Sequence, residues 1–285
     1  MQDSLSLREL LNLGTEQLEA NGVENARGDA LELINMVKKV DKTDMLLYPD
    51  MKFSKAEAEE VKKLFDKRAE RIPLQHILGK ACFYGHEFYV NENVLIPRFD
   101  TEIIVDEVLK YIKNERRGEA LKILDMCTGS GCIAISLAME NEKLECLGAD
   151  ISLQALEIAQ KNKKSLKAGN VDLIQSDLFS KVEGKFDIIV SNPPYIDKKE
   201  LNDLSPEVAE HDPHLALFAE DGGLYFYRKI AKEAGAFLNV KGKIFFEIGY
   251  DQAEDVAGIL SNEGYSDICL IKDYGGNDRV IIGKI

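Results

Sequence analysis

Short apolar segments alternate with amphipathic segments from Ala120 onward, and this alternation restricts the chain to few folds. Repeated strand–helix units place their strands side by side and parallel, with right-handed crossovers. We therefore predict an α/β fold with a doubly wound, mostly parallel, seven-stranded Rossmann-like sheet in residues 98–285. The predicted strands are 121–125, 144–150, 171–175, 186–191, 243–247, 266–272 and 279–285, and the predicted helices are 132–139, 153–166, 224–237 and 252–260.

Residues 1–72 show a different pattern. Their apolar side chains recur at helical spacing in three segments, 5–19, 25–40 and 54–71, which are separated by turn signals such as Asn21-Gly22. This pattern predicts a small all-α domain. It contains no catalytic constellation, so we expect it to recognise a macromolecule.

Residues 73–97 are predicted to link the two domains. The stretch 82–90 has β character, and Gly85-His86 could turn a hairpin within it. Asp100 or Thr101 is then expected to cap a helix that runs to about Lys113.

The strongest functional signal is the tetrapeptide Asn192-Pro193-Pro194-Tyr195, which follows the apolar run 186–191. Such a run is typical of a strand buried on both faces of a parallel sheet, and the prolines end it. Because prolines lack an N–H, the carbonyls of Asn192 and Pro193 and the Asn192 side-chain oxygen meet few competing donors. These acceptors could hold both hydrogens of a substrate –NH2, with Tyr195 as a flat wall. A strand followed by a Pro-rich turn without function is the alternative.

A glycine-rich turn, Cys127-Thr128-Gly129-Ser130-Gly131, joins the first predicted strand to a helix. Asp150 closes the second strand, where its carboxylate could accept from two ribose hydroxyls. The spacing between the glycine-rich turn and Asp150 suits a nucleoside ligand. The segment 129–134 also fits the G-x-G-x-x-A pattern of dinucleotide sites, so NAD and a turn without a ligand both stay open.

Asp177 and Leu178 follow the third strand. The Asp177 carboxylate could accept from an adenine amino group while Leu178 packs against the ring. Alternatively, Asp177 caps a turn.

The charge of the chain bears on the class of macromolecule that it binds. The net charge is −14 with no basic stripe, which favours a protein partner over nucleic acid. The five cysteines lack a Cys-x-x-Cys spacing and the four histidines are scattered, so we expect neither disulfides nor a metal site. No apolar run is long enough to cross a membrane, and residues 1–8 lack a signal-peptide core. A cytoplasmic monomer is expected.

Taken together, these motifs resemble the class I methyltransferases that use S-adenosylmethionine, and most closely the release-factor glutamine N5-methyltransferases, the PrmC/HemK family. The resemblance covers nearly the whole chain. Besides the motifs above, it includes the segments 94–102, 222–228, 247–252 and 272–279. The family usually has Arg-Pro-Glu-Thr-Glu where this chain has Arg98-Phe99-Asp100-Thr101-Glu102, and often an aromatic residue at Leu178.

The resemblance implies methyl transfer from S-adenosylmethionine to the side-chain amide nitrogen of the Gln in the Gly-Gly-Gln motif of peptide-chain release factors, leaving S-adenosylhomocysteine. Cofactor contacts are implied for Cys127 through Gly131, Asp150, Asp177, Leu178 and Asn192, and substrate contacts for Asn192, Pro193, Pro194 and Tyr195. Asn192 Oδ1 and the Pro193 carbonyl would accept the two amide hydrogens. The alternatives are methylation of Gln on a ribosomal protein, N6-methylation of adenine in nucleic acid, and a non-enzymatic S-adenosylmethionine-binding module.

Overall fold

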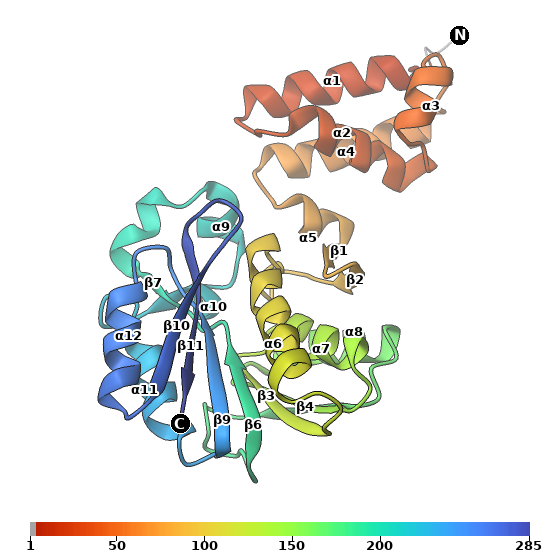
Figure 1. Ribbon diagram of the computed structural model, residues 1–285. Coiled ribbons are helices and arrows are strands. Elements are labelled where there is room, and N and C mark those ends of the chain that lie inside the picture. Colours follow the sequence, from red (N-terminus) through yellow and green to blue (C-terminus); the bar gives the residue numbers. More distant parts are fainter. Residues whose placement is uncertain (1–3) are drawn as a thin grey trace. The chain divides into compact units, whose positions relative to one another are not determined.

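Two units make up the computed structural model, which describes residues 4–285 (Figure 1). The first unit contains the chain up to Gly79 together with Ser205–His211. The second contains Lys80–Leu204 and Asp212–Ile285. The stretch predicted as a linker is thus divided, with its first residues in the helical unit and its hairpin in the larger unit.

The first unit is helical, as predicted. Its helices are α1 (Leu7–Ala20), α2 (Ala26–Lys38), α3 (Lys42–Leu47), α4 (Lys55–Ala69), α5 (Leu74–Leu78) and α9 (Pro206–His211). α1 and α4 begin with capping boxes, formed by Ser6 with Glu9 and by Ser54 with Glu57. Helices α1, α2 and α4 bury a common core that includes Leu10, Leu33 and Phe65. The short helices α3, α5 and α9 were not predicted.

An ion-pair network holds α9 against α4. Glu207 accepts from Arg68 at 2.9 Å and from Arg71 at 2.5 Å, and Arg68 also contacts Asp29 at 2.8 Å. Burial opposes the ionisation of Glu207, but the hydrogen bonds from Arg71 and Arg68 outweigh it and lower the Glu207 pKa to about 2. Segment 205–211 is therefore attached to the helical unit by charge-assisted hydrogen bonds.

The second unit is built on a seven-stranded sheet with the order β10-β11-β9-β6-β3-β4-β5. β3, β4, β5, β6 and β9 are parallel, whereas β11 runs antiparallel to β9 and β10. The predicted doubly wound, mostly parallel sheet is confirmed. Its strands are β3 (Leu121–Met126), β4 (Leu144–Asp150), β5 (Val171–Gln175), β6 (Phe186–Ser191), β9 (Leu238–Glu247), β10 (Ser266–Lys272) and β11 (Asp278–Lys284).

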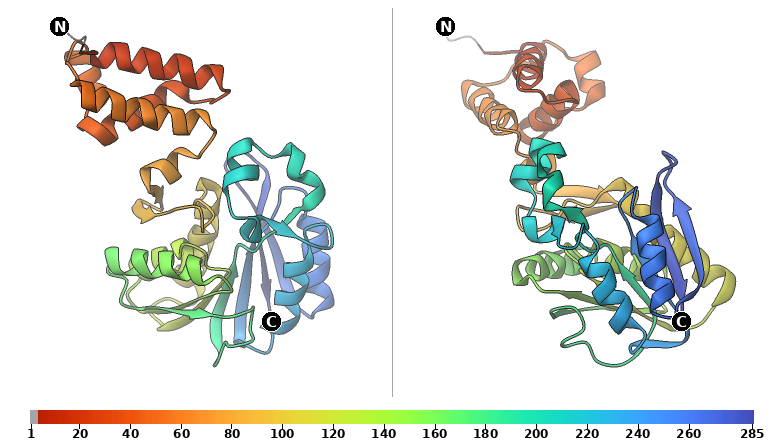
Figure 2. Two further views of the ribbon diagram at one scale, coloured as in Figure 1. Left: turned by 180° about the vertical axis from the view of Figure 1, so that it is seen from behind. Right: turned by 90° about the vertical axis from the view of Figure 1, so that its left-hand side faces the viewer.

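Helices cover both faces of this sheet (Figure 2). α6 (Glu102–Glu115) and α7 (Cys132–Glu140) contribute to one apolar cluster, and α11 (Tyr225–Ala234) and α12 (Ala253–Asn262) to the other. α8 (Leu153–Ser165) packs beside α7 against β4 and β5.

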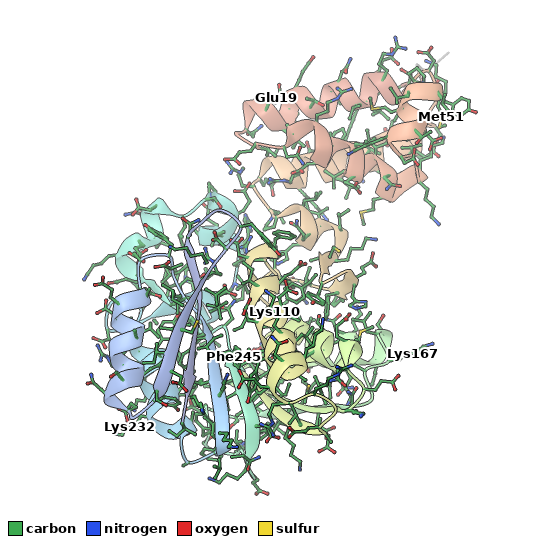
Figure 3. The ribbon with its side chains drawn as sticks, in the orientation of Figure 1. Glu19, Met51, Lys110, Lys167, Lys232 and Phe245 are labelled. Carbon is green, nitrogen blue, oxygen red and sulfur yellow. The ribbon has the colours of Figure 1, made fainter. Side chains whose placement is uncertain are left out.

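Strand β6 supplies both clusters, because successive side chains of a strand point to opposite faces. Ile188 and Val190 belong to the first cluster and Ile189 to the second. The Phe245 ring of β9, labelled in Figure 3, packs on Tyr111 of α6 with ring centroids 6.0 Å apart.

The predicted hairpin is present as β1 (Lys80–Phe83) and β2 (His86–Tyr89). The predicted position of its turn, Gly85-His86, is wrong by one residue. Tyr84 and Gly85 form the turn with φ values of 49° and 75°, and His86 already pairs with Phe83. The Tyr84 conformation is supported by a hydrogen bond from its N–H to Glu102, 2.7 Å away.

Residues 196–219 form several short elements that the sequence did not predict. They are β7 (Ile196–Asp197), η2 (Lys198–Asp203), α10 (His214–Leu217) and β8 (Phe218–Ala219), in addition to α9. Another short element, η1 (Phe99–Thr101), precedes α6. Among residues 4–285, no helix combines the length and apolar character needed to cross a membrane.

Candidate active site

A cavity of about 460 Å³ lies in the second unit, where the carboxyl ends of β3, β4 and β6 meet. This is the edge of an open α/β sheet at which ligands bind. The volume falls in the range of small-molecule sites. The predicted residues in its lining are Cys127, Thr128, Gly129, Ser130, Asp150, Asp177, Leu178, Asn192 and Pro194.

The glycine-rich turn has the strained backbone that its composition suggests. Cys127, Gly129 and Gly131 have φ values of 64°, 54° and 79°. A Cβ on Gly131 would lie 3.0 Å from Cδ1 of Ile135 and 3.2 Å from Cβ of Ala159, so the turn can approach α8 only with glycine there. Gly131 itself lies behind the cavity lining, at the start of α7.

Asp125 lies beneath this turn and was not predicted as a site residue. It is 0% exposed, and its Oδ2 accepts from the Thr128 hydroxyl at 2.5 Å and from the Ala134 N–H at 3.1 Å. Its Oδ1 is buried without a hydrogen-bond partner. Burial raises the pKa of Asp125 to about 7, against the hydrogen bonds from Thr128 and Ala134. The position of an acidic residue at the end of β3, next to the turn, was the signal available in the sequence.

Asp150 ends β4 and faces the same turn. Its Oδ2 accepts from the Gly129 N–H at 2.8 Å, and its Oδ1 accepts from the Ser152 N–H at 2.9 Å. Burial raises the pKa of Asp150, and these backbone hydrogen bonds oppose the rise. The carboxylate is therefore held rigidly at the cavity wall with lone pairs left for a ligand.

The segment after β5 supplies Asp177 and Leu178. Ser176 organises this segment: its hydroxyl donates to the Leu178 carbonyl at 2.6 Å and accepts from the Lys181 N–H at 3.0 Å. Leu178 consequently has a φ of 45°. Both Asp177 and Leu178 reach the cavity lining.

Asn192 stands at the end of β6 on the opposite wall. Its Nδ2 donates to Oγ1 of Thr101, 3.3 Å away, which leaves the side-chain oxygen Oδ1 on the other side of the amide. Thr101 also lines the cavity and is 3% exposed. Sequence reasoning treated Thr101 only as a helix cap, yet its side chain makes no capping hydrogen bond.

Glu247 is a second buried carboxyl that sequence reasoning did not assign to the site. It is 2% exposed, and its Oε2 lacks a hydrogen-bond partner. Burial raises the pKa of Glu247 to about 7, and the Thr101 hydroxyl, the charge of Arg279 and the Asn192 amide oppose this rise. The sequence signal that could have identified Glu247 was its position at the end of the strand next to β6.

Pro193 and Tyr195 lie outside the cavity lining, adjacent to Asn192 and Pro194. The Tyr195 carbonyl accepts from Nε2 of Gln252 at 2.9 Å. Gly223 packs tightly on this peptide group: a Cβ on Gly223 would lie 2.1 Å from the Tyr195 carbonyl oxygen. The backbone after Asn192 is thus held by two residues from later in the chain.

Two family profiles match the sequence. The methyltransferase small domain matches residues 103–215, and the PrmC N-terminal domain matches residues 9–79. The two matches fall mainly in the second and the first unit, respectively.

Curated relatives resemble the chain over almost its whole length. A release factor glutamine methyltransferase of Fusobacterium nucleatum is 41% identical over 97% of this chain and 78% of its own. One of Agrobacterium fabrum is 40% identical over 93% of both chains, and one of Geobacter sulfurreducens is 38% identical over 98% of this chain and 97% of its own. Among solved structures, a methyltransferase from Pyrococcus furiosus shares the fold, with a TM-score of 0.54, 21% identity, and coverage of 77% of this chain and 98% of that one.

Proposed function

Because the chain belongs to the family of release factor glutamine methyltransferases, we propose that its cavity binds S-adenosylmethionine and that Asn192 presents the substrate glutamine to it. The observation that carries this proposal is the orientation of Asn192. Its –NH2 group donates to Thr101, so Oδ1 is free to accept from another –NH2 group at the cavity wall.

The cavity fits S-adenosylmethionine. Asp150 has lone pairs left to accept from ribose hydroxyls, and the turn 127–131 brings backbone close to a ligand. Asp177 and Leu178 would border the adenine. When bound, the cofactor supplies an electrophilic methyl group on a positively charged sulfur.

The residues that would hold the substrate compensate for the weak nucleophilicity of its amide nitrogen. The lone pair of an amide nitrogen is delocalised into its carbonyl. Oδ1 of Asn192 and the Pro193 carbonyl would each accept one hydrogen of the glutamine –NH2 and so aim the nitrogen at the methyl group. As the methyl carbon would bond to this nitrogen, its bond to sulfur would break and the sulfur would leave as a neutral thioether. The acceptors would stabilise the positive charge that develops on the nitrogen, which would then lose one proton to water. Tyr195 would form an apolar wall beside the amide.

The helical unit would provide recognition. We assign release-factor binding to residues 1–72, since this region carries a separate core and residues 9–79 match the PrmC N-terminal domain. The net charge of −14 is consistent with a protein substrate rather than free nucleic acid. With such a partner, we propose a cytoplasmic location for the enzyme.

Transfer of labelled methyl groups tests this function. The full-length protein should label a release factor from methyl-labelled S-adenosylmethionine, and should not label the same factor after the Gln of Gly-Gly-Gln is replaced by Ala. Mass spectrometry should place the methyl group on that Gln. Label in both factors, or in neither, contradicts the proposal. Ribosomal proteins and adenine-containing nucleic acid in parallel reactions test the alternatives.

A further inference from the structure

Glu247 is the last residue of β9, and Asn192 directly follows the adjacent strand β6. Ser191 in β6 pairs with Phe246 in β9, so the next residues of both strands are neighbours at the carboxyl edge of the sheet. The backbone of Glu247 is fixed from two sides, by pairing with Val280 and by a hydrogen bond from the Tyr227 hydroxyl to its carbonyl at 2.9 Å. The backbone of Glu247 is therefore held next to Asn192, and its side chain is buried at this edge.

Thr101 links the two side chains. Its hydroxyl oxygen accepts from Nδ2 of Asn192 at 3.3 Å. Burial raises the pKa of Glu247, and the Thr101 hydroxyl opposes that rise. The Asn192 amide, which the strand register places next to Glu247, also opposes the rise of the Glu247 pKa. If the Asn192 amide were flipped, its oxygen instead of its –NH2 group would lie toward the charge of the neighbouring Glu247 carboxylate. The buried carboxylate thus selects one of the two amide orientations.

We propose that Glu247 is a positioning residue for methyl transfer, which orients and polarises the Asn192 amide so that Oδ1 accepts strongly from the substrate –NH2 group. This inference rests on the function proposed above. Hydrogen bonds in a chain polarise one another, and a negative charge behind the –NH2 end of Asn192 increases the electron density on its oxygen. The same charge also favours the positive charge that develops on the substrate nitrogen.

The groups that face Glu247 come from several elements. Asp100 and Thr101 lie before α6, Asn192 follows β6, and Arg279 belongs to β11. Arg279 is itself paired with Asp273 at 3.1 Å and with Asp100 at 3.7 Å, so it compensates the Glu247 charge only in part. The partial compensation by Arg279 agrees with the pKa of Glu247, which burial raises to about 7.

The proposal predicts how kcat depends on pH. Only the ionised carboxylate polarises Asn192, so kcat should rise with pH through a midpoint at or below about 7, because a bound sulfonium cation would favour the ionised form. Asp125 also has a pKa of about 7, but it lies under the cofactor turn. The variants must therefore distinguish the effect of Glu247 ionisation on kcat from that of Asp125 ionisation.

Glu247→Gln is the main test, because it keeps the shape of the side chain and removes its charge. At saturating concentrations of both substrates, we expect kcat to fall about 10-fold or more and its rise with pH to disappear. Affinity for S-adenosylhomocysteine, measured by calorimetry, should stay within about twofold because this residue lies outside the cavity lining. Asp125→Asn, the matched control, should keep the pH midpoint of kcat. An E247Q enzyme with the kcat and pH profile of the wild type overturns the proposal.

Thr101→Val keeps the proposal testable if Glu247→Gln fails to fold. The Thr101 hydroxyl opposes the rise of the Glu247 pKa, so its loss should move the midpoint of kcat to higher pH. Carboxyl ¹³C NMR of the enzyme without substrates should show the Glu247 midpoint moving in the same direction. If the NMR midpoint moves and the kcat midpoint does not, the proposal is wrong. A wild-type enzyme that never labels the release-factor Gln contradicts the proposed function instead, and the NMR titration still reports on Glu247.

Discussion

The side-chain amide of Asn192 donates to the hydroxyl oxygen of Thr101, 3.3 Å away, although 91 positions of sequence separate them. Thr101 lies in the short turn before α6, and Asn192 follows β6. A loop that precedes the sheet thus orients the acceptor at the end of a central strand.

Asn192→Ala should lower kcat about 100- to 1,000-fold, which is the usual loss when one aimed hydrogen bond to a developing charge is removed. Affinity for S-adenosylmethionine should change much less. Steady-state methylation of a release factor measures the first effect, and calorimetry the second. Asn262→Ala, at an exposed residue of α12, is the control and should match the wild type. Near-normal turnover by Asn192→Ala would rule out this role.

Asp150→Asn should weaken binding of S-adenosylmethionine by about 10- to 100-fold, since hydrogen bonds to charged groups contribute roughly 1.5–3 kcal/mol. The variant also loses acceptor capacity toward the Gly129 N–H, which holds the turn. Equilibrium dialysis with labelled cofactor measures the affinity. Asp172→Asn provides the control, because Asp172 is an exposed residue of neighbouring β5. Equal affinities of the two variants would contradict the assignment of Asp150 to the cofactor.

Two buried carboxyls should make stability depend on pH. Burial raises the pKa of both Asp125 and Glu247 to about 7, above the values of about 4 expected in the unfolded chain. Between these values the folded state binds more protons than the unfolded state. The free energy of unfolding should therefore fall as pH rises from about 4 to about 7, and level off above that.

Urea unfolding between about pH 5 and pH 8 measures this dependence. The double variant Asp125→Asn, Glu247→Gln should lose most of it, since neither replacement titrates. If the double variant keeps the wild-type slope, other groups cause the dependence.

Gly223→Ala should damage the protein more than Gly222→Ala. Both glycines have positive φ, 84° and 62°, so alanine is strained at either position by about 1–2 kcal/mol. Only at Gly223 would the new Cβ meet the Tyr195 carbonyl oxygen, whereas a Cβ on Gly222 would meet nothing within 4 Å. We expect a lower melting temperature and weaker methylation for Gly223→Ala. Equal losses of melting temperature and methylation in the two variants would show that backbone strain alone causes the damage.

Glu207→Gln should destabilise the helical unit by roughly 1–3 kcal/mol, because Arg68 and Arg71 lose a charged acceptor in a partly buried site. The ion pairs lower the Glu207 pKa to about 2, below its unfolded value. Their stabilisation should therefore be present above about pH 4.3 and be lost as pH falls toward 2.

Hydrogen exchange of the amides of α4 measures this effect. Glu210→Gln is the control, because Glu210 is an exposed residue of α9, the helix that contains Glu207. The amides of α4 in this variant should exchange like those of the wild type. Unchanged protection of α4 in Glu207→Gln would show that the network does not hold the segment.

Most of the regular elements could be predicted, because hydrophobic periodicity over six or more residues reports directly on burial. The strand Phe186–Ser191 and the helix Leu153–Ser165 lie almost where the pattern placed them. The two-residue strands β7 and β8 are too short to show any period. The start of β9 was missed because Asn239, Lys241 and Gly242 interrupt the apolar run.

The sequence by itself determined which chemical groups stand at the strand ends: the glycine turn, Asp150 and Asn192-Pro193-Pro194-Tyr195 follow directly from local chain chemistry. Only the tertiary structure decided what surrounds them. The order β9-β6-β3-β4 brings Glu247 beside Asn192 and Asp150 beside Gly129. Burial then raises the pKa of Asp125 and Glu247, because desolvation depends on neighbours that are distant in sequence.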